Sequence, residues 1–162
     1  MAGKAEPRVV VTHSAEETRK LGAALGPGLQ RGDLLVLSGG LGAGKTTLVQ
    51  GIAEGMGVEG RVTSPTYIIA RVHPGLEGSP DLVHVDAYRV GDQLDLETID
   101  LDATLDDAVT VVEWGAGKVE GLSDQRLEIL LGFADEQEPG RIITLRAVGE
   151  TWLGRLKGMD LS

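Results

Sequence analysis

A glycine-rich turn between an apolar run and a helical stretch constrains the fold of this chain more than any other feature of its sequence. The run at 33–38 is apolar enough to form a strand that is buried on both faces of a sheet. From Lys45, a stretch with the length of about three helical turns leads to Gly55 and Gly57. The spacing of the turn matches G-x-x-x-x-G-K-[ST], and a preceding strand with a following helix is the context in which that pattern forms a phosphate loop.

The residue types in this turn suit a polyphosphate. Glycines let backbone N–H groups turn toward phosphate oxygens without interference from a Cβ atom, and the helix N-terminus adds a partial positive charge. Lys45 is expected to reach the β and γ phosphates, and the Thr46 hydroxyl is expected to bind Mg²⁺. We therefore predict that the nucleotide is bound by Gly39, Gly40, Leu41, Gly42, Ala43, Gly44, Lys45, Thr46 and Thr47.

Two acidic residues, Asp86 and Glu113, each end an apolar strand candidate. Ligands of open α/β sheets bind outside the carboxyl ends of the strands, and Mg²⁺ prefers oxygen ligands. We predict that Asp86 binds Mg²⁺ directly or through water, and that Glu113 either assists the metal or orients the attacking water. The predicted metal residues are thus Thr46, Asp86 and Glu113, and the predicted catalytic residues are Lys45, Asp86 and Glu113.

The order of the apolar runs predicts one α/β domain over residues 1–162. Early strands alternate with helices and later strands do not, so we expect the three-layer sandwich of P-loop NTPases, with a mixed sheet that has a parallel core and antiparallel additions. Ser14 and Glu17 form a capping-box signature at the start of a helix. The expected strands are 8–12, 33–38, 66–72, 82–85, 109–112, 127–133 and 141–147, and further helices are expected at 149–158 and around Leu94, Leu101 and Leu105.

The net charge of −10 is concentrated in one segment. Residues 81–113 contain ten acids and one base, which suits either a solvated face or a region that binds a metal or a basic partner. The acidic balance argues against unaided nucleic-acid binding, which needs Lys and Arg to neutralise phosphates. The absence of Cys excludes disulfides and zinc–thiolate sites, and no apolar run reaches the roughly 20 residues of a membrane helix. With no apolar signal core at the N-terminus, we expect a cytoplasmic protein without membrane contacts.

The sequence has several further features that could concern the nucleotide site or the core. The hydroxyls of Thr63, Ser64 and Thr66 could sense the γ-phosphate in an order–disorder switch, or this segment could simply start a strand. Trp114 suits either a functional position or the core, whereas His84, inside a strand candidate, is interpreted as structural. Because the chain has no Asn, it cannot supply the Asn-Lys-x-Asp loop with which dedicated GTPases commonly read guanine, which favours ATP.

Four motifs occur together in a specific order. They are Leu-Gly-Ala-Gly-Lys-Thr-Thr at 41–47, Thr-Ser-Pro-Thr-Tyr at 63–67, His-Val-Asp-Ala-Tyr-Arg at 84–89 and Val-Glu-Trp at 112–114. In this combination the chain resembles the TsaE family of small bacterial ATPases. The resemblance implies an ATPase that works with TsaD and TsaB in the biosynthesis of tRNA N6-threonylcarbamoyladenosine, and that depends on these partners for hydrolysis. It also implies that Trp114 lies near the nucleotide or a partner.

The sequence departs from the family pattern at several positions. Gly40 stands where the family usually has Asp, and Asp100 where it usually has Gly. Gly115 replaces a frequent Pro, and Val85 and Ala87 replace bulkier apolar residues on either side of Asp86. Two other functions remain open on the sequence alone. One is a P-loop kinase for a small molecule, although Arg71 and Arg89 are isolated and no Arg-rich lid is evident. The other is a nucleotide-gated binding module without significant turnover.

Overall fold

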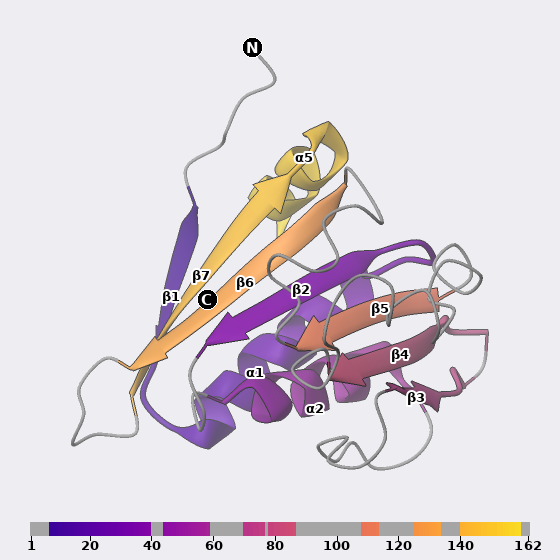
Figure 1. The fold of residues 1–162 in the computed structure, drawn as a ribbon, viewed down its shortest axis with the longest axis horizontal. Coiled ribbons are helices and arrows are strands. Elements are labelled where there is room, and N and C mark those ends of the chain that lie inside the picture. Colours follow the sequence, from indigo (N-terminus) through magenta and orange to yellow (C-terminus); the bar gives the residue numbers. More distant parts are fainter. Residues whose placement is uncertain are drawn as a thin grey trace.

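A seven-stranded mixed sheet with the strand order β1-β7-β6-β2-β5-β4-β3 forms the frame of the protein (Figure 1). This computed structural model describes residues 7–39, 44–58, 70–76, 78–86, 108–113, 125–133 and 140–159. The elements are β1 (Arg8–Thr12), α1 (Ala15–Leu25), the 3-10 turn η1 (Gly26–Gly28), β2 (Leu34–Gly39), α2 (Lys45–Met56), β3 (Ala70–His73), β4 (Asp81–Asp86), β5 (Ala108–Glu113), β6 (Arg126–Phe133), β7 (Arg141–Val148) and α5 (Glu150–Gly158).

The predicted mixed sheet is confirmed. Strands β6, β2, β5 and β4 run parallel and form the centre of the sheet. Three antiparallel strands complete it, with β7 and then β1 beyond β6, and β3 beyond β4. The central strand β2 is buried from Leu34 to Leu37, as its continuous apolar run predicted for a strand covered on both faces. The glycine-rich turn begins at the carboxyl end of β2, which lies between β5 and β6 in the sheet.

Local signals place the helix ends as expected. Ser14 caps α1, where its Oγ accepts a hydrogen bond from the backbone N–H of Glu17 at 3.1 Å. Helix α2 ends at Met56, and Gly57 follows in a left-handed conformation with φ of 72° and donates its N–H to the carbonyl of Ala53. The helix predicted for 149–158 is present as α5. The predicted helix around Leu94, Leu101 and Leu105, and residues 66–69 of the third predicted strand, lie outside the described residues.

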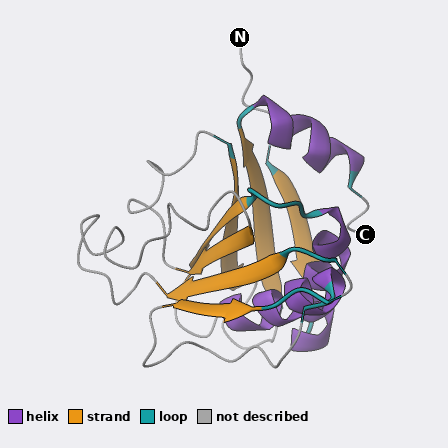
Figure 2. Cartoon of the chain, turned by 90° about the vertical axis from the view of Figure 1, so that its right-hand side faces the viewer, coloured by secondary structure: helices purple, strands orange, loops and turns teal. Residues whose placement is uncertain are grey.

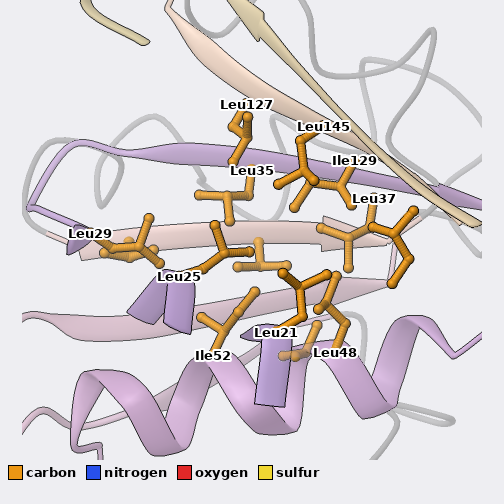
Figure 3. Packing of buried hydrophobic residues seen from close by; sticks show 14 of the residues in the cluster. Leu21, Leu25, Leu29, Leu35, Leu37, Leu48, Ile52, Leu127, Ile129 and Leu145 are labelled. Atoms are coloured by element: carbon orange, nitrogen blue, oxygen red, sulfur yellow. The ribbon is translucent and has the colours of Figure 1, made fainter. Parts of the chain in front are cut away.

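The described helices α1, α2 and α5 all pack on the same side of the sheet (Figure 2). Their apolar side chains join those of the sheet in one buried cluster, in which leucines and isoleucines from α1 and α2 meet those of β2, β6 and β7 (Figure 3). The helical layer that we expect on the opposite face would fall on segments outside the described residues. Within the described ranges, none of the helices combines the length and the apolar character that crossing a membrane would need.

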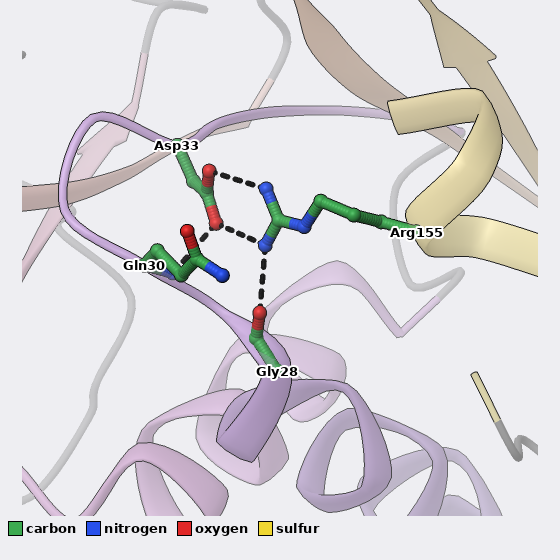
Figure 4. A network of polar contacts seen from close by, with 4 residues as sticks. All are labelled: Gly28, Gln30, Asp33 and Arg155. Atoms are coloured by element: carbon green, nitrogen blue, oxygen red, sulfur yellow. Dashed lines mark hydrogen bonds and ion pairs between the residues drawn. The ribbon is translucent and has the colours of Figure 1, made fainter. Parts of the chain in front are cut away.

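Helix α5 is held to the amino end of β2 by Arg155 (Figure 4). The guanidinium donates two hydrogen bonds of 2.7 Å to the two carboxylate oxygens of Asp33 and a third to the carbonyl of Gly28. It also stacks on the ring of Trp152, with 4.0 Å from Cζ to the ring centroid. Asp33 accepts a further hydrogen bond from the backbone N–H of Gln30. This network lies at the end of β2 opposite to the glycine-rich turn.

We expect Arg155→Ala to lower the free energy of unfolding by about 1–3 kcal/mol, because it removes charged hydrogen bonds from a nearly buried carboxylate. Arg155→Lys should lie between this variant and the wild type, since an ammonium group cannot bind both oxygens of Asp33 in the planar, forked manner of a guanidinium. Urea denaturation of the three proteins tests the order. If Arg155→Lys were as stable as the wild type, the two-point contact would contribute nothing.

Candidate functional site

The predicted phosphate loop lies between the carboxyl end of β2 and the start of α2. Its last glycine, Gly44, is the N-cap of α2 and has φ of 102° and ψ of 18°, a left-handed conformation that residues with a Cβ atom rarely adopt. The carbonyl of Gly44 accepts the first hydrogen bond of the helix, from the N–H of Leu48 at 2.9 Å. The glycine in the G-K-[ST] part of the motif is thus required by the backbone geometry of the turn.

Lys45, the first residue of α2, folds back toward the strand before the loop. Its side chain is buried, with 6% of the residue exposed, and Nζ donates a hydrogen bond to the carbonyl of Gly39 at 2.9 Å. A buried ammonium group needs such partners, because transfer out of water is otherwise costly. The contact places the cationic end of Lys45 between the two ends of the loop.

The first turn of α2 carries no acidic side chain. Thr46 and Thr47 follow Lys45 there and are half-buried. The backbone N–H groups of a first turn have no partners inside the helix, and they carry the positive end of the helix dipole. With Lys45 beside them, these groups form an electropositive site that suits phosphate oxygens.

The two predicted acidic residues are neighbours in the sheet. Asp86 pairs with Glu113 across β4 and β5, and Glu113 pairs with Leu37 of β2, two residues before Gly39. The structure thus brings the backbones of both acids to the sheet edge from which the loop starts, as expected for the carboxyl ends of parallel strands. The side chain of Asp86 is outside the described part of the structure. Glu113 is buried, with 5% of the residue exposed.

Glu113 makes a contact that sequence reasoning missed. Its Oε2 accepts a hydrogen bond from Nε2 of His84, which lies on β4 and is fully buried. The sequence favours a structural role for His84, because this residue lies inside a strand candidate and has no metal-ligand spacing to the other histidines. The sequence does contain a signal for a site role of His84. This residue interrupts an apolar strand two residues before Asp86, and side chains two apart along a strand point to the same face of the sheet.

Several predicted site residues lie outside the described residues, and their roles stay predictions. They are Gly40, Leu41, Gly42 and Ala43 of the loop, the switch-like Thr63, Ser64 and Thr66, and Trp114.

The residues at the loop suit Mg²⁺ by their chemistry. Thr46 and Glu113 offer oxygen atoms, which are the ligands that Mg²⁺ prefers. Among the described residues, no three or more His, Asp or Glu side chains gather into a group that could hold a metal by themselves.

Comparisons with known proteins agree on one family. Residues 12–143 match the family model of "Threonylcarbamoyl adenosine biosynthesis protein TsaE". A relative from Streptomyces coelicolor, named tRNA threonylcarbamoyladenosine biosynthesis protein TsaE, is 54% identical over 137 residues, which are 83% of this chain and 93% of the relative. The protein of the same name from Bacillus subtilis is 37% identical over 142 residues, covering 87% of this chain and 86% of the relative. The crystal structure of Bacillus subtilis YdiB superposes with a TM-score of 0.78 at 31% identity and covers 94% of this chain and 93% of that one.

Proposed function

The chain belongs to the TsaE family, and from this premise we propose that it is an ATPase that hydrolyses ATP to ADP and phosphate in the biosynthesis of tRNA N6-threonylcarbamoyladenosine. One observation carries the ATPase part of the proposal. Lys45 is buried with Nζ against the carbonyl of Gly39 at the end of β2, and Glu113, the last residue of the neighbouring β5, pairs with Leu37 near the same strand end. A cation for phosphate and a carboxylate for water or metal are the two groups that phosphoanhydride hydrolysis needs.

In this proposal each residue has a stated role. Lys45 and the N–H groups of the first turn of α2 bind the β and γ phosphates, and Thr46 and Asp86 hold Mg²⁺, which neutralises phosphate charge when bound. Glu113 orients the attacking water or assists the metal. The protein contributes mainly position and electrostatic stabilisation, because phosphoryl transfer needs little covalent chemistry from side chains.

We also propose that the ATPase acts through protein partners, TsaD and TsaB, in the cytoplasm. The net charge of −10 supports this, because a strongly acidic chain lacks the Lys and Arg excess that binds tRNA phosphates. The tRNA contacts would then belong to the partners.

The test is phosphate release from ATP and Mg²⁺ by the wild-type chain alone, with TsaD, with TsaB and with both. We expect slow release by the chain alone and clear acceleration when both partners are present. Transfer of the γ-phosphate to a small acceptor instead of water would identify a kinase. Nucleotide binding without turnover in any of the mixtures would identify a binding module, and either outcome would refute the proposed ATPase.

A further inference from the structure

His84 and Glu113 form a buried polar pair near the carboxyl end of β2, where the predicted phosphate loop begins. They lie on the neighbouring parallel strands β4 and β5, and Nε2 of His84 contacts Oε2 of Glu113. The residue pairing places His84 opposite Val111, two residues before the pair of Asp86 and Glu113 at the strand ends. The imidazole of His84 therefore contacts the Glu113 carboxylate from a position farther from the strand ends, inside the sheet.

The chemistry of the pair defines which atom donates. A carboxylate oxygen accepts hydrogen bonds, so Nε2 of His84 bears the hydrogen and donates a hydrogen bond to Oε2 of Glu113. Burying a carboxylate costs free energy unless the group is hydrogen-bonded. The bond from His84 supplies such a partner and fixes the orientation of the Glu113 carboxylate. The contact uses Oε2 and leaves Oε1 of Glu113 outside it.

The pair is a poor choice for stability alone. The buried side chains that precede the pair on the same face of β4 and β5 are apolar, namely Leu82, Val109 and Val111. Buried charged pairs are often no more stabilising than apolar side chains of similar volume. In addition, Nδ1 of His84 is buried and has no hydrogen-bond partner among the described residues, which costs free energy that an apolar residue would not.

We infer that His84 is a positioning residue for the proposed ATPase reaction. It holds Oε2 of Glu113, so that Oε1 accepts a hydrogen bond from the attacking water in a defined direction. His84 acts through Glu113 and does not itself touch the nucleotide. This inference rests on the proposed function, because it assigns a role within that reaction.

The test compares His84→Leu, His84→Gln and Glu113→Gln by partner-stimulated kcat and by nucleotide Kd from calorimetric titration. Leucine fills a similar volume without a donor, whereas the glutamine amide can place an N–H near the position of Nε2. We expect His84→Leu to lower kcat by about 10- to 100-fold, the usual cost of losing a residue that orients a site group, with little change in Kd. His84→Gln should recover most of the lost kcat. The exposed Glu54→Gln on α2 serves as the control for Glu113→Gln and should behave as the wild type.

A double variant separates positioning from a merely structural role. If His84 acts through Glu113, adding His84→Leu to Glu113→Gln should lower kcat no further, because contacting residues that act as a unit are not additive. Fully additive losses would overturn the inference, as would a wild-type kcat in His84→Leu or a loss confined to Kd. If His84→Leu does not fold, His84→Asn takes its place in the test. The asparagine side chain is one methylene shorter than that of glutamine, so its amide does not reach Oε2 of Glu113.

Failure of the inference and failure of the proposed function give different results. Absence of wild-type turnover with both partners would refute the ATPase, and the inference would fall with it. Wild-type turnover that Glu113→Gln removes and His84→Leu leaves intact would overturn the inference alone.

Discussion

Lys45→Ala should weaken ATP binding by about 10- to 150-fold, because a hydrogen bond to a charged group contributes about 1.5–3 kcal/mol and each 1.4 kcal/mol is a factor of ten. The structure supports a direct role, since Nζ of Lys45 is buried against the carbonyl of Gly39 at the start of the loop. On nucleotide binding, phosphate oxygens would become its charged partners. Alanine keeps the helix start intact, as it has the highest helix propensity.

Calorimetric titration with ATP and Mg²⁺ measures this effect. The matched control is Lys20→Ala on α1, which removes the same charge from a side chain that is 73% exposed. Any loss of affinity in the control reports the change in net charge, and the excess loss in Lys45→Ala reports the loop contact. If the two variants bind ATP equally well, the phosphate-loop assignment is wrong.

Gly51→Ala should lower the free energy of unfolding by about 3 kcal/mol, the upper part of the range for overpacked sites. Helices α1 and α2 approach so closely that a Cβ atom at Gly51 would lie 1.9 Å from the carbonyl oxygen of Arg19. The neighbouring glycines are equally restricted, because a Cβ atom at Gly22 would lie 2.3 Å from the carbonyl oxygen of Leu48, and one at Gly55 would lie 2.4 Å from that of Ala23. These partners are backbone atoms, so relief requires the helices to move apart.

Thermal unfolding checks this prediction, with an expected decrease in Tm of about 6–12 °C for a domain of this size. Gly154→Ala in α5 is the control, because the substitution and the secondary structure are the same and a Cβ atom there would have no neighbour within 4 Å. That control should be stabilised by up to about 1 kcal/mol through helix propensity. A Gly51→Ala protein as stable as Gly154→Ala would show that the helices separate at no cost.

Much of the fold follows from residue types that are close together in the chain. The apolar run before Gly39, the Ser14 cap and Gly57 at the end of α2 each act within one strand or helix end, and the structure confirms all three. Part of the candidate site can also be predicted from the sequence. An acidic residue at the end of a parallel strand is expected at the carboxyl edge of the sheet, where ligands bind. That rule predicted that Glu113 lies at the same edge of the sheet as the glycine-rich turn. The strand order of the structure adds that β5 is a direct neighbour of β2.

Other features depend on which distant segments meet. The pairing of β1 with β7 joins the two ends of the chain, and no local pattern specifies that partner. The contact of His84 with Glu113 needs the register of β4 against β5, since a shift of one residue would turn one side chain to the opposite face. Arg155 and Asp33 likewise meet only after α5 packs beside β2.

The sequence by itself therefore determined the place of the glycine-rich turn between β2 and α2, most of the strand and helix positions and the family, because these depend on side-chain and backbone preferences over a few residues. Only the tertiary structure decided which partners the site residues have. Register and packing distances are properties of segments far apart in the chain, and they set the burial of Lys45, the partner of Glu113 and the close approach of α1 to α2.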